Sequence, residues 1–81
     1  AHGPAAGLQI LEPLRAHKAM RQYPWLPGVR GDLLARLGRH AEAQVEFMQA
    51  AALAGNACER ALMQARASEA ARAAEAPAQR N

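Results

Sequence analysis

The sequence predicts an all-α fold, and three observations support this. Alanine abounds, whereas the β-branched residues are limited to Ile10, Val29 and Val45. Alanine is the best helix former, and β-branched side chains favour strands. Apolar residues also recur at helical spacing, in segments separated by glycine and proline. We therefore expect about four helices joined by short turns.

The first helix is expected to begin at Pro4, because proline suits the first helical position, where no N–H is needed. Leu8 and Leu11 share one face of this helix, and Ile10 and Leu14 share another. Pro13 lies inside the pattern and lacks a backbone donor. We expect it either to kink the helix or to end it near Glu12.

The second helix is predicted to begin between Pro24 and Pro27 and to run to Leu37. Its entry, YPWLPGV (23–29), holds the chain's only tyrosine and only tryptophan. Gly31 and Ala35 lie four residues apart, so a neighbouring backbone could approach closely there. The predicted apolar stripe consists of Leu26, Val29, Leu33 and Leu37.

The third helix is predicted over about residues 40–54, after Gly38 supplies the left-handed residue that ends the second. It carries two apolar lines, and Glu42, Glu46 and Gln49 form its water-facing side. A helix that is apolar on two sides needs neighbours on two sides, which predicts at least a three-helix layer. The two lines are Ala41, Val45, Met48, Ala52 and Ala43, Phe47, Ala50, Ala54.

The fourth helix is expected to start after Asn56, a strong N-cap, with Glu59 placed three residues later as in a capping box. Beyond Ala65 its apolar residues are all alanines, so we expect the second half to bury little, before Pro77 ends the helix. The predicted domain is 1–76, cut from a longer protein, with 77–81 as a disordered tail. The stripe expected to be buried is Cys58, Ala61, Leu62 and Ala65.

The side chains that could carry chemistry do not form a catalytic or metal-binding pattern. Glu42 and Glu46 lie four residues apart on a predicted solvated face, without a cleft to enclose them. We therefore expect no enzyme activity, no cofactor and no small-molecule substrate. Zinc ligands would have to come from residues that lack C-x2-C or H-x3-H spacing, namely His2, His17, His40 and Cys58.

The net charge is +3, from ten basic and seven acidic residues. Arg30, Arg36 and Arg39 cluster with Asp32 between them. Three interpretations stay open for this cluster: a polar rim with internal salt bridges, a protein-docking surface, or a phosphate-binding face. On the docking interpretation these four residues are the candidates for partner contact.

No apolar run approaches the roughly 20 residues needed to span a bilayer, and no signal-peptide pattern is present. The single cysteine, Cys58, excludes an internal disulfide and suits a reducing compartment. We expect a cytoplasmic chain without a membrane partner.

The segment GDLLARLGRHAEAQVEFMQAAALAGN (31–56) resembles a tetratricopeptide unit, which is two antiparallel helices over about 34 residues. Gly31, Gly38, Ala43, Phe47 and Ala50 sit at that pattern's offsets. The resemblance implies a tetratricopeptide-like right-handed stack of about four antiparallel helices. It makes the junction around Gly38 a helix-hairpin turn.

A more specific resemblance is carried by GPAAGL (3–8), LPGVRGDLLARLGRHAEA (26–43) and AALAGNACERALMQARA (51–67). Together these resemble the C-terminal helical extension of bacterial extracytoplasmic-function-type sigma factors of the sigma-70 family. The resemblance implies a non-catalytic regulatory domain that contacts the sigma-factor core regions, RNA polymerase or a regulator. DNA would be contacted only through upstream domains. The alternative is a free-standing tetratricopeptide-type adaptor or scaffold unrelated to transcription.

Overall fold

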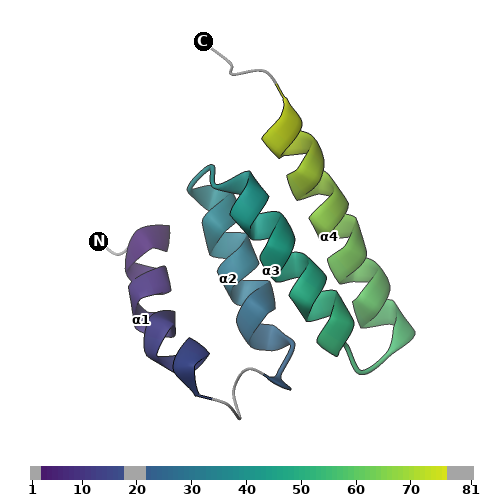
Figure 1. Cartoon of the computed structure of the whole chain (residues 1–81), viewed down its shortest axis with the longest axis horizontal. Helices are drawn as coiled ribbons and strands as arrows, with labels where there is room; N and C mark the ends of the chain where they lie inside the picture. The colour runs from purple at the N-terminus through teal and green to yellow at the C-terminus, as the bar shows by residue number, and fades with distance from the viewer. Residues whose placement is uncertain (1–2, 18–21, 77–81) are drawn as a thin grey trace.

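The computed structural model describes residues 3–17 and 22–76, and these form four α-helices and no strand. In chain order the helices are α1 (Pro4–Ala16), α2 (Trp25–Arg36), α3 (His40–Leu53) and α4 (Ala57–Glu75). Each helix packs on the next, and α2, α3 and α4 lie side by side in alternating directions (Figure 1). The all-α prediction is confirmed. The tail predicted at 77–81 lies outside the described residues, as do residues 1–2 and 18–21 of the predicted domain.

Helix α1 begins with Pro4 at its first turn, as predicted, and buries Leu8 and Leu11. It does not end near Glu12, because Pro13 lies inside the helix, which continues to Ala16. Of the two outcomes expected at Pro13, an end of the helix near Glu12 is therefore wrong. A proline so close to the C-terminal end removes a donor from the last turn only, which a helix tolerates better than a break at its centre.

The turn between α2 and α3 confirms the role predicted for Gly38, whose φ is +80°. The N–H of Arg39 donates to the carbonyl of Leu34 at 2.9 Å, and the N–H of Gly38 donates to that of Ala35 at 3.0 Å. This pair of bonds is the Schellman motif, which satisfies carbonyls left free at a helix end. The junction is the bend of a helical hairpin.

The centre of the fold is the contact between Phe47 of α3 and Gly31 of α2. Phe47 is buried, and a Cβ placed on Gly31 would lie 2.8 Å from two carbons of its ring. A close approach does occur at Gly31, but an aromatic side chain makes it and not the neighbouring backbone that was predicted. Leu8 of α1 extends the same core, and the remaining buried members are Leu34, Ala43, Ala67 and Ala70.

Helix α3 contacts two helices, α2 and α4, but the predicted burial of both of its apolar lines is wrong. Ala43, Phe47 and Ala50 are buried, whereas Val45 is 64% and Met48 56% exposed. Both neighbouring helices contact the Phe47 side of α3. Helix α1 packs on α2, and a groove remains between α1 and the Val45 side of α3. The side expected to face water is also partly wrong, because the Glu46 side chain is only 17% exposed.

Helix α2 buries a different face from the predicted stripe. Leu26 is buried as expected, but Val29 and Leu37 are 40% and 38% exposed, and Leu34 is the most deeply buried leucine of this helix. The inward face is shifted by about one residue, so it passes through Arg30, Gly31 and Leu34. Gly31 lets α3 approach at this face, which explains why the close contact forms there and not along the Val29–Leu33 line.

Helix α4 starts as predicted, since the Asn56 Oδ1 accepts a 2.8 Å hydrogen bond from the N–H of Glu59. In return, the Glu59 side chain accepts from the N–H of Gly55 at 3.4 Å. The predicted apolar stripe is wrong because Cys58, Ala61, Leu62 and Ala65 are all exposed. The alanine-rich second half is the part that packs, through Ala67 and Ala70. Small side chains let α4 lie close against α3, which the expectation of little burial overlooked.

Candidate protein-interaction site

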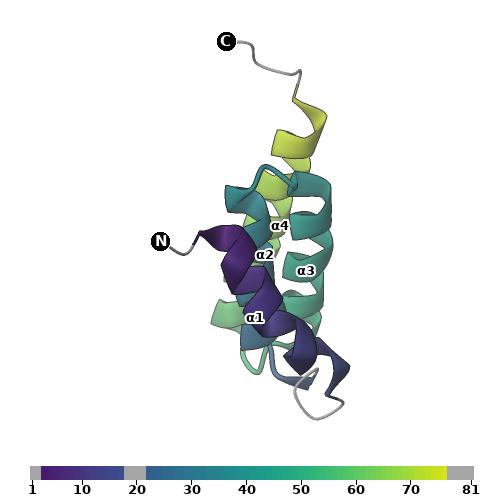
Figure 2. The same ribbon diagram turned by 90° about the vertical axis from the view of Figure 1, so that its left-hand side faces the viewer.

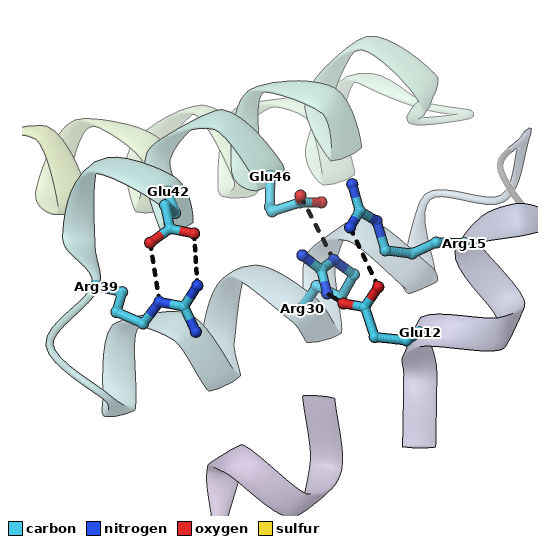
Figure 3. A network of polar contacts seen from close by, with 6 residues as sticks. All are labelled: Glu12, Arg15, Arg30, Arg39, Glu42 and Glu46. Carbon is cyan, nitrogen blue, oxygen red and sulfur yellow. Dashed lines mark hydrogen bonds and ion pairs between the residues drawn. The ribbon is translucent and has the colours of Figure 1, made fainter. Parts of the chain in front are cut away.

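The four residues predicted for partner contact do not form one patch. Arg30 is buried between helices, Asp32 and Arg36 lie on the α4 side of α2, and Arg39 lies in the α2–α3 turn. Their ionic partners also differ, as Figure 3 shows for Arg30 and Arg39.

Arg30 is only 7% exposed and joins three helices (Figure 3). Its Nη1 donates to Glu12 Oε2 of α1 at 2.9 Å, and its Nε lies 3.5 Å from Glu46 Oε2 of α3. That Nε makes no hydrogen bond within the part of the chain the structure describes. Arg15 also pairs with Glu12, at 3.4 Å. Of the three interpretations, internal salt bridges describe Arg30, which does not offer its charge to the surface.

Arg39 and Glu42 form a closed pair on the surface (Figure 3). Nε and Nη2 of Arg39 donate to the two carboxylate oxygens of Glu42 at 2.9 and 2.7 Å. This hydrogen bonding raises the pKa of Arg39 and lowers the pKa of Glu42. The fork-to-fork geometry holds the first turn of α3 against the preceding turn. Two of this arginine's five N–H donors are therefore already used within the chain.

Asp32 bridges two helices. Its Oδ2 lies 3.3 Å from Arg36 Nη2 on the same helix, and its Oδ1 lies 3.5 Å from Arg66 Nη1 on α4. The Arg36 side chain is 65% exposed. The pairing of Arg66 with Asp32 is a tertiary contact that spacing within one helix does not reveal.

A shallow groove between α2 and α4, close to the end of α3, was missed by the sequence analysis. Trp25 is 47% and Leu62 52% exposed at this groove, and Val29 lies beside them. Apolar side chains predominate among its lining residues, which are Pro24, Trp25, Gly28, Val29, Ala54, Glu59, Leu62 and Met63. One signal was available: the chain's only tryptophan stands between two prolines, so its ring is held at a helix entry.

Further along α2 and α4, a second depression contains charged and polar groups. Asp32, His40, Arg66 and Glu69 line it, with the edge of Phe47 at its base. The α2–α4 side therefore offers an apolar end near Trp25 and a charged end near Asp32. Surfaces of this kind accept an apolar anchor flanked by polar contacts.

Groups able to perform acid–base or metal chemistry do not converge within residues 3–17 and 22–76. Glu42 and Glu46 each pair with an arginine, and no three His, Cys, Asp or Glu side chains gather as a metal site. Cys58 is exposed, which corrects its predicted place on a buried stripe. His2 lies outside the described residues. Among the helices described, none has both the length and the apolar character to cross a bilayer.

Comparison with known proteins finds a similar protein of unassigned role. No protein-family model matches the chain, and no solved structure matches it. The chain is similar to an uncharacterized protein of Rhizobium meliloti (strain 1021), with 46% identity over 59 residues. This match covers 73% of the chain but only 14% of the relative, so the relative is about seven times as long as the matched stretch.

Proposed function

We propose that this chain is a non-catalytic protein-interaction domain that modulates transcription initiation as the C-terminal extension of an extracytoplasmic-function-type sigma factor. The proposal starts from the motif residues shared with such extensions. Gly38 closes the hairpin, Asn56 caps α4 and Asp32 joins α2 to α4. Because these residues maintain the fold, the resemblance is one of fold. The exposed side chains then determine which partner binds.

The arrangement of α2, α3 and α4 is compatible with tetratricopeptide-like stacking. In such a stack α2 and α3 make one unit, α1 is the second helix of the unit before, and α4 the first helix of the next. An ion pair joins α2 directly to α4, between Asp32 Oδ1 and Arg66 Nη1 at 3.5 Å, and Gly28 and Met63 line the same groove between the two helices. First helices of successive units are neighbours in repeat arrays, and their shared side is where such arrays bind partners.

The observation that carries the proposal is the apolar groove at Trp25 and Leu62. Both side chains are about half exposed and lie on adjacent helices over a base of small residues. We place the partner's apolar anchor in this groove. Asp32 and Arg36 lie further along and are the polar contacts in this proposal, whereas Arg30 and Arg39 are already occupied within the chain.

The length of the Rhizobium relative supports an appended domain. A similar stretch there occupies a small part of a much longer chain, as a regulatory extension on promoter-reading and polymerase-binding domains would. The partner is then the sigma-factor core regions, RNA polymerase or a regulator, in the cytoplasm. DNA is contacted by the other domains.

The experiment is to co-purify the full-length protein with core RNA polymerase and to measure transcription from its own promoter, with Trp25→Ala and Leu62→Ala as groove variants. We expect both variants to co-purify less with core RNA polymerase or to change the amount of transcript. Ile10→Ala is the control, because Ile10 is 71% exposed but lies on α1, outside the groove lining.

The gene sequence upstream of Ala1 separates the two functional classes. Sigma-type core-binding helices and a helix-turn-helix there support the transcription proposal. If these elements are absent, the transcription proposal fails and the free-standing adaptor remains. The same groove variants would then test whether the adaptor's partner binds in the groove.

A further inference from the structure

Helix α3 carries an apolar stripe that residues 3–17 and 22–76 leave largely exposed. Val45 and Met48 are 64% and 56% exposed, and Ala41 and Ala52 continue the stripe to both ends of the helix. The steps along the stripe are four, three and four residues, which is the spacing of a coiled-coil seam. At about 3.6 residues per turn the stripe lies opposite Ala43, Phe47 and Ala50, which face the core.

The stripe lies on a ridge of the molecule. Figure 2 shows α3 at the right-hand edge, with α1 crossing in front of α2 and its C-terminal end directed towards the same edge. Grooves follow the ridge on both flanks: one towards Glu12 and Arg15 of α1, the other towards Arg60 and Gln64 of α4. Between these grooves the face of α3 that carries Val45 and Met48 is exposed and can contact another helix.

The stripe is self-complementary about its midpoint, between residues 46 and 47. In an antiparallel pair of identical helices, each residue faces the one at the same distance on the other side of the midpoint. Val45 of one copy then faces Met48 of the other, and Ala41 faces Ala52. Each large side chain thus meets a large one, and each alanine meets an alanine, which brings the helix ends close.

The charges beside the stripe do not oppose this pairing. Gln44 and Gln49 flank it at the centre, and the one flanking carboxylate, Glu42, is already held by Arg39. In the antiparallel pair the two Glu42 residues lie nine positions apart along the axis, about 13 Å. The helix dipoles also oppose each other in this orientation, whereas a parallel pair would align them.

We propose that the exposed face of α3 is a homodimer interface, in which α3 packs antiparallel on α3 of a second copy. The seam contains two large and two small side chains from each copy, which is less than a standard-size interface supplies. The dimer is therefore a weak one, formed at high concentration or when other domains raise the local concentration. This inference is independent of the proposed role in transcription, which uses the opposite α2–α4 side.

Sedimentation equilibrium of the 81-residue chain tests the proposal, over about 10 μM to 1 mM, a range that spans weak affinities. We expect the average mass to rise with concentration from 8.7 kDa towards twice that value. Val45→Glu places two carboxylates in the seam and should weaken association by about tenfold or more. Ile10→Glu adds the same charge at an equally exposed apolar position on α1 and should leave association unchanged.

The double variant Val45→Glu with Met48→Lys fixes the orientation. In the antiparallel pair each new Glu faces a new Lys of the other copy, so association should return to within a fewfold of the unmodified chain. In a parallel pair the new like charges would face each other and association would stay weak. Circular dichroism should show unchanged helix content in every variant, because the substituted side chains are exposed. A chain that stays monomeric throughout the range, or a double variant that stays as weak as the single one, overturns the proposal.

Discussion

Two neighbouring residues of α2 join it to the other helices by opposite means. Gly31 has no side chain and accepts the ring of Phe47 from α3, so that junction depends on size. Arg30 extends a long charged side chain between Glu12 of α1 and Glu46 of α3, so that junction depends on charge. The Gly31–Phe47 contact holds the α2–α3 hairpin together, and the Arg30 ion pairs attach α1 to that hairpin.

The difference indicates which part of the fold is the more robust. A change of side-chain volume at Gly31 or Phe47 lowers the free energy of unfolding strongly, because packed interiors relax only partly. The Arg30 junction is half open to water on one side, since the Glu12 side chain is 52% exposed and the Glu46 side chain 17%. Removing charge there leaves Glu12 solvated and Glu46 short of a partner. Helix α1 is therefore expected to loosen before α2, α3 and α4 do.

Phe47→Ala should have the largest effect. Truncating a buried aromatic side chain costs about 3–5 kcal/mol of unfolding free energy, which is a large share of the stability of a domain this small. We expect the variant to be mostly unfolded at 37 °C, measured by urea denaturation followed by circular dichroism. Met48→Ala, one residue away but on the exposed face, is the control and should cost less than about 1 kcal/mol. Equal losses in the two variants would contradict the assigned orientation of α3.

Arg30→Met should cost about 1–3 kcal/mol, because the apolar stem is kept while Glu46 loses its partner. Arg15→Met removes the other arginine bound to Glu12, but its side chain is 50% exposed, so the cost should be below about 0.5 kcal/mol. Hydrogen exchange adds the location: amides of α1 should exchange faster in Arg30→Met, while those of α3 change less. Uniform acceleration across all helices would show that Arg30 does not act chiefly on α1.

Two glycines of the same helix should respond with opposite signs. A Cβ at Gly31 would meet the Phe47 ring at 2.8 Å, so Gly31→Ala should destabilise by about 1–2 kcal/mol even after the helix-propensity gain. A Cβ at Gly28 would make an ordinary 3.6 Å contact with Met63, so Gly28→Ala should stabilise by up to about 1 kcal/mol. Thermal denaturation of the two single variants gives the comparison. A stabilising Gly31→Ala would mean that the ring does not sit on this glycine.

The smallest effect is expected from the exposed Arg39–Glu42 pair. The folded-state pKa of Glu42 is lowered by its hydrogen bonds to Arg39, so its contribution to stability is present above the unfolded-state pKa. That contribution is lost as the pH falls through the folded-state value. NMR titration of the side-chain carboxyl carbons should show the lowered pKa of Glu42, and Arg39→Gln should return it towards the ordinary glutamate value. An unchanged titration in Arg39→Gln would show that the pair does not persist in solution.

Local features of the fold could be predicted from the sequence. Pro4 at a helix start, Gly38 at a left-handed turn and Asn56 at a cap each answer a backbone requirement that only a few residue types meet. The close approach at Gly31 and the burial of Phe47 follow from a small residue and the one phenylalanine.

The choice of covered faces could not be predicted in the same way. Periodicity shows which residues share a face, but the packing of the other helices decides whether that face is covered. Val45 and Leu62 were placed in the core and are exposed, while Ala67 and Ala70 are buried because their small size admits a close helix. The candidate site was limited for the same reason: the burial of Arg30 and the groove at Trp25 both depend on more than one helix.

The most direct test of the account is an NMR measurement of the contact between Phe47 and Gly31. We expect strong nuclear Overhauser effects from the ring protons of Phe47 to the α-protons of Gly31, and α-proton resonances of Gly31 shifted upfield by the ring current. If these effects are absent, or if the Phe47 ring contacts only residues within α3, then α3 is turned differently. The buried core, the exposed stripe at Val45 and both proposed surfaces would then have to be reassigned.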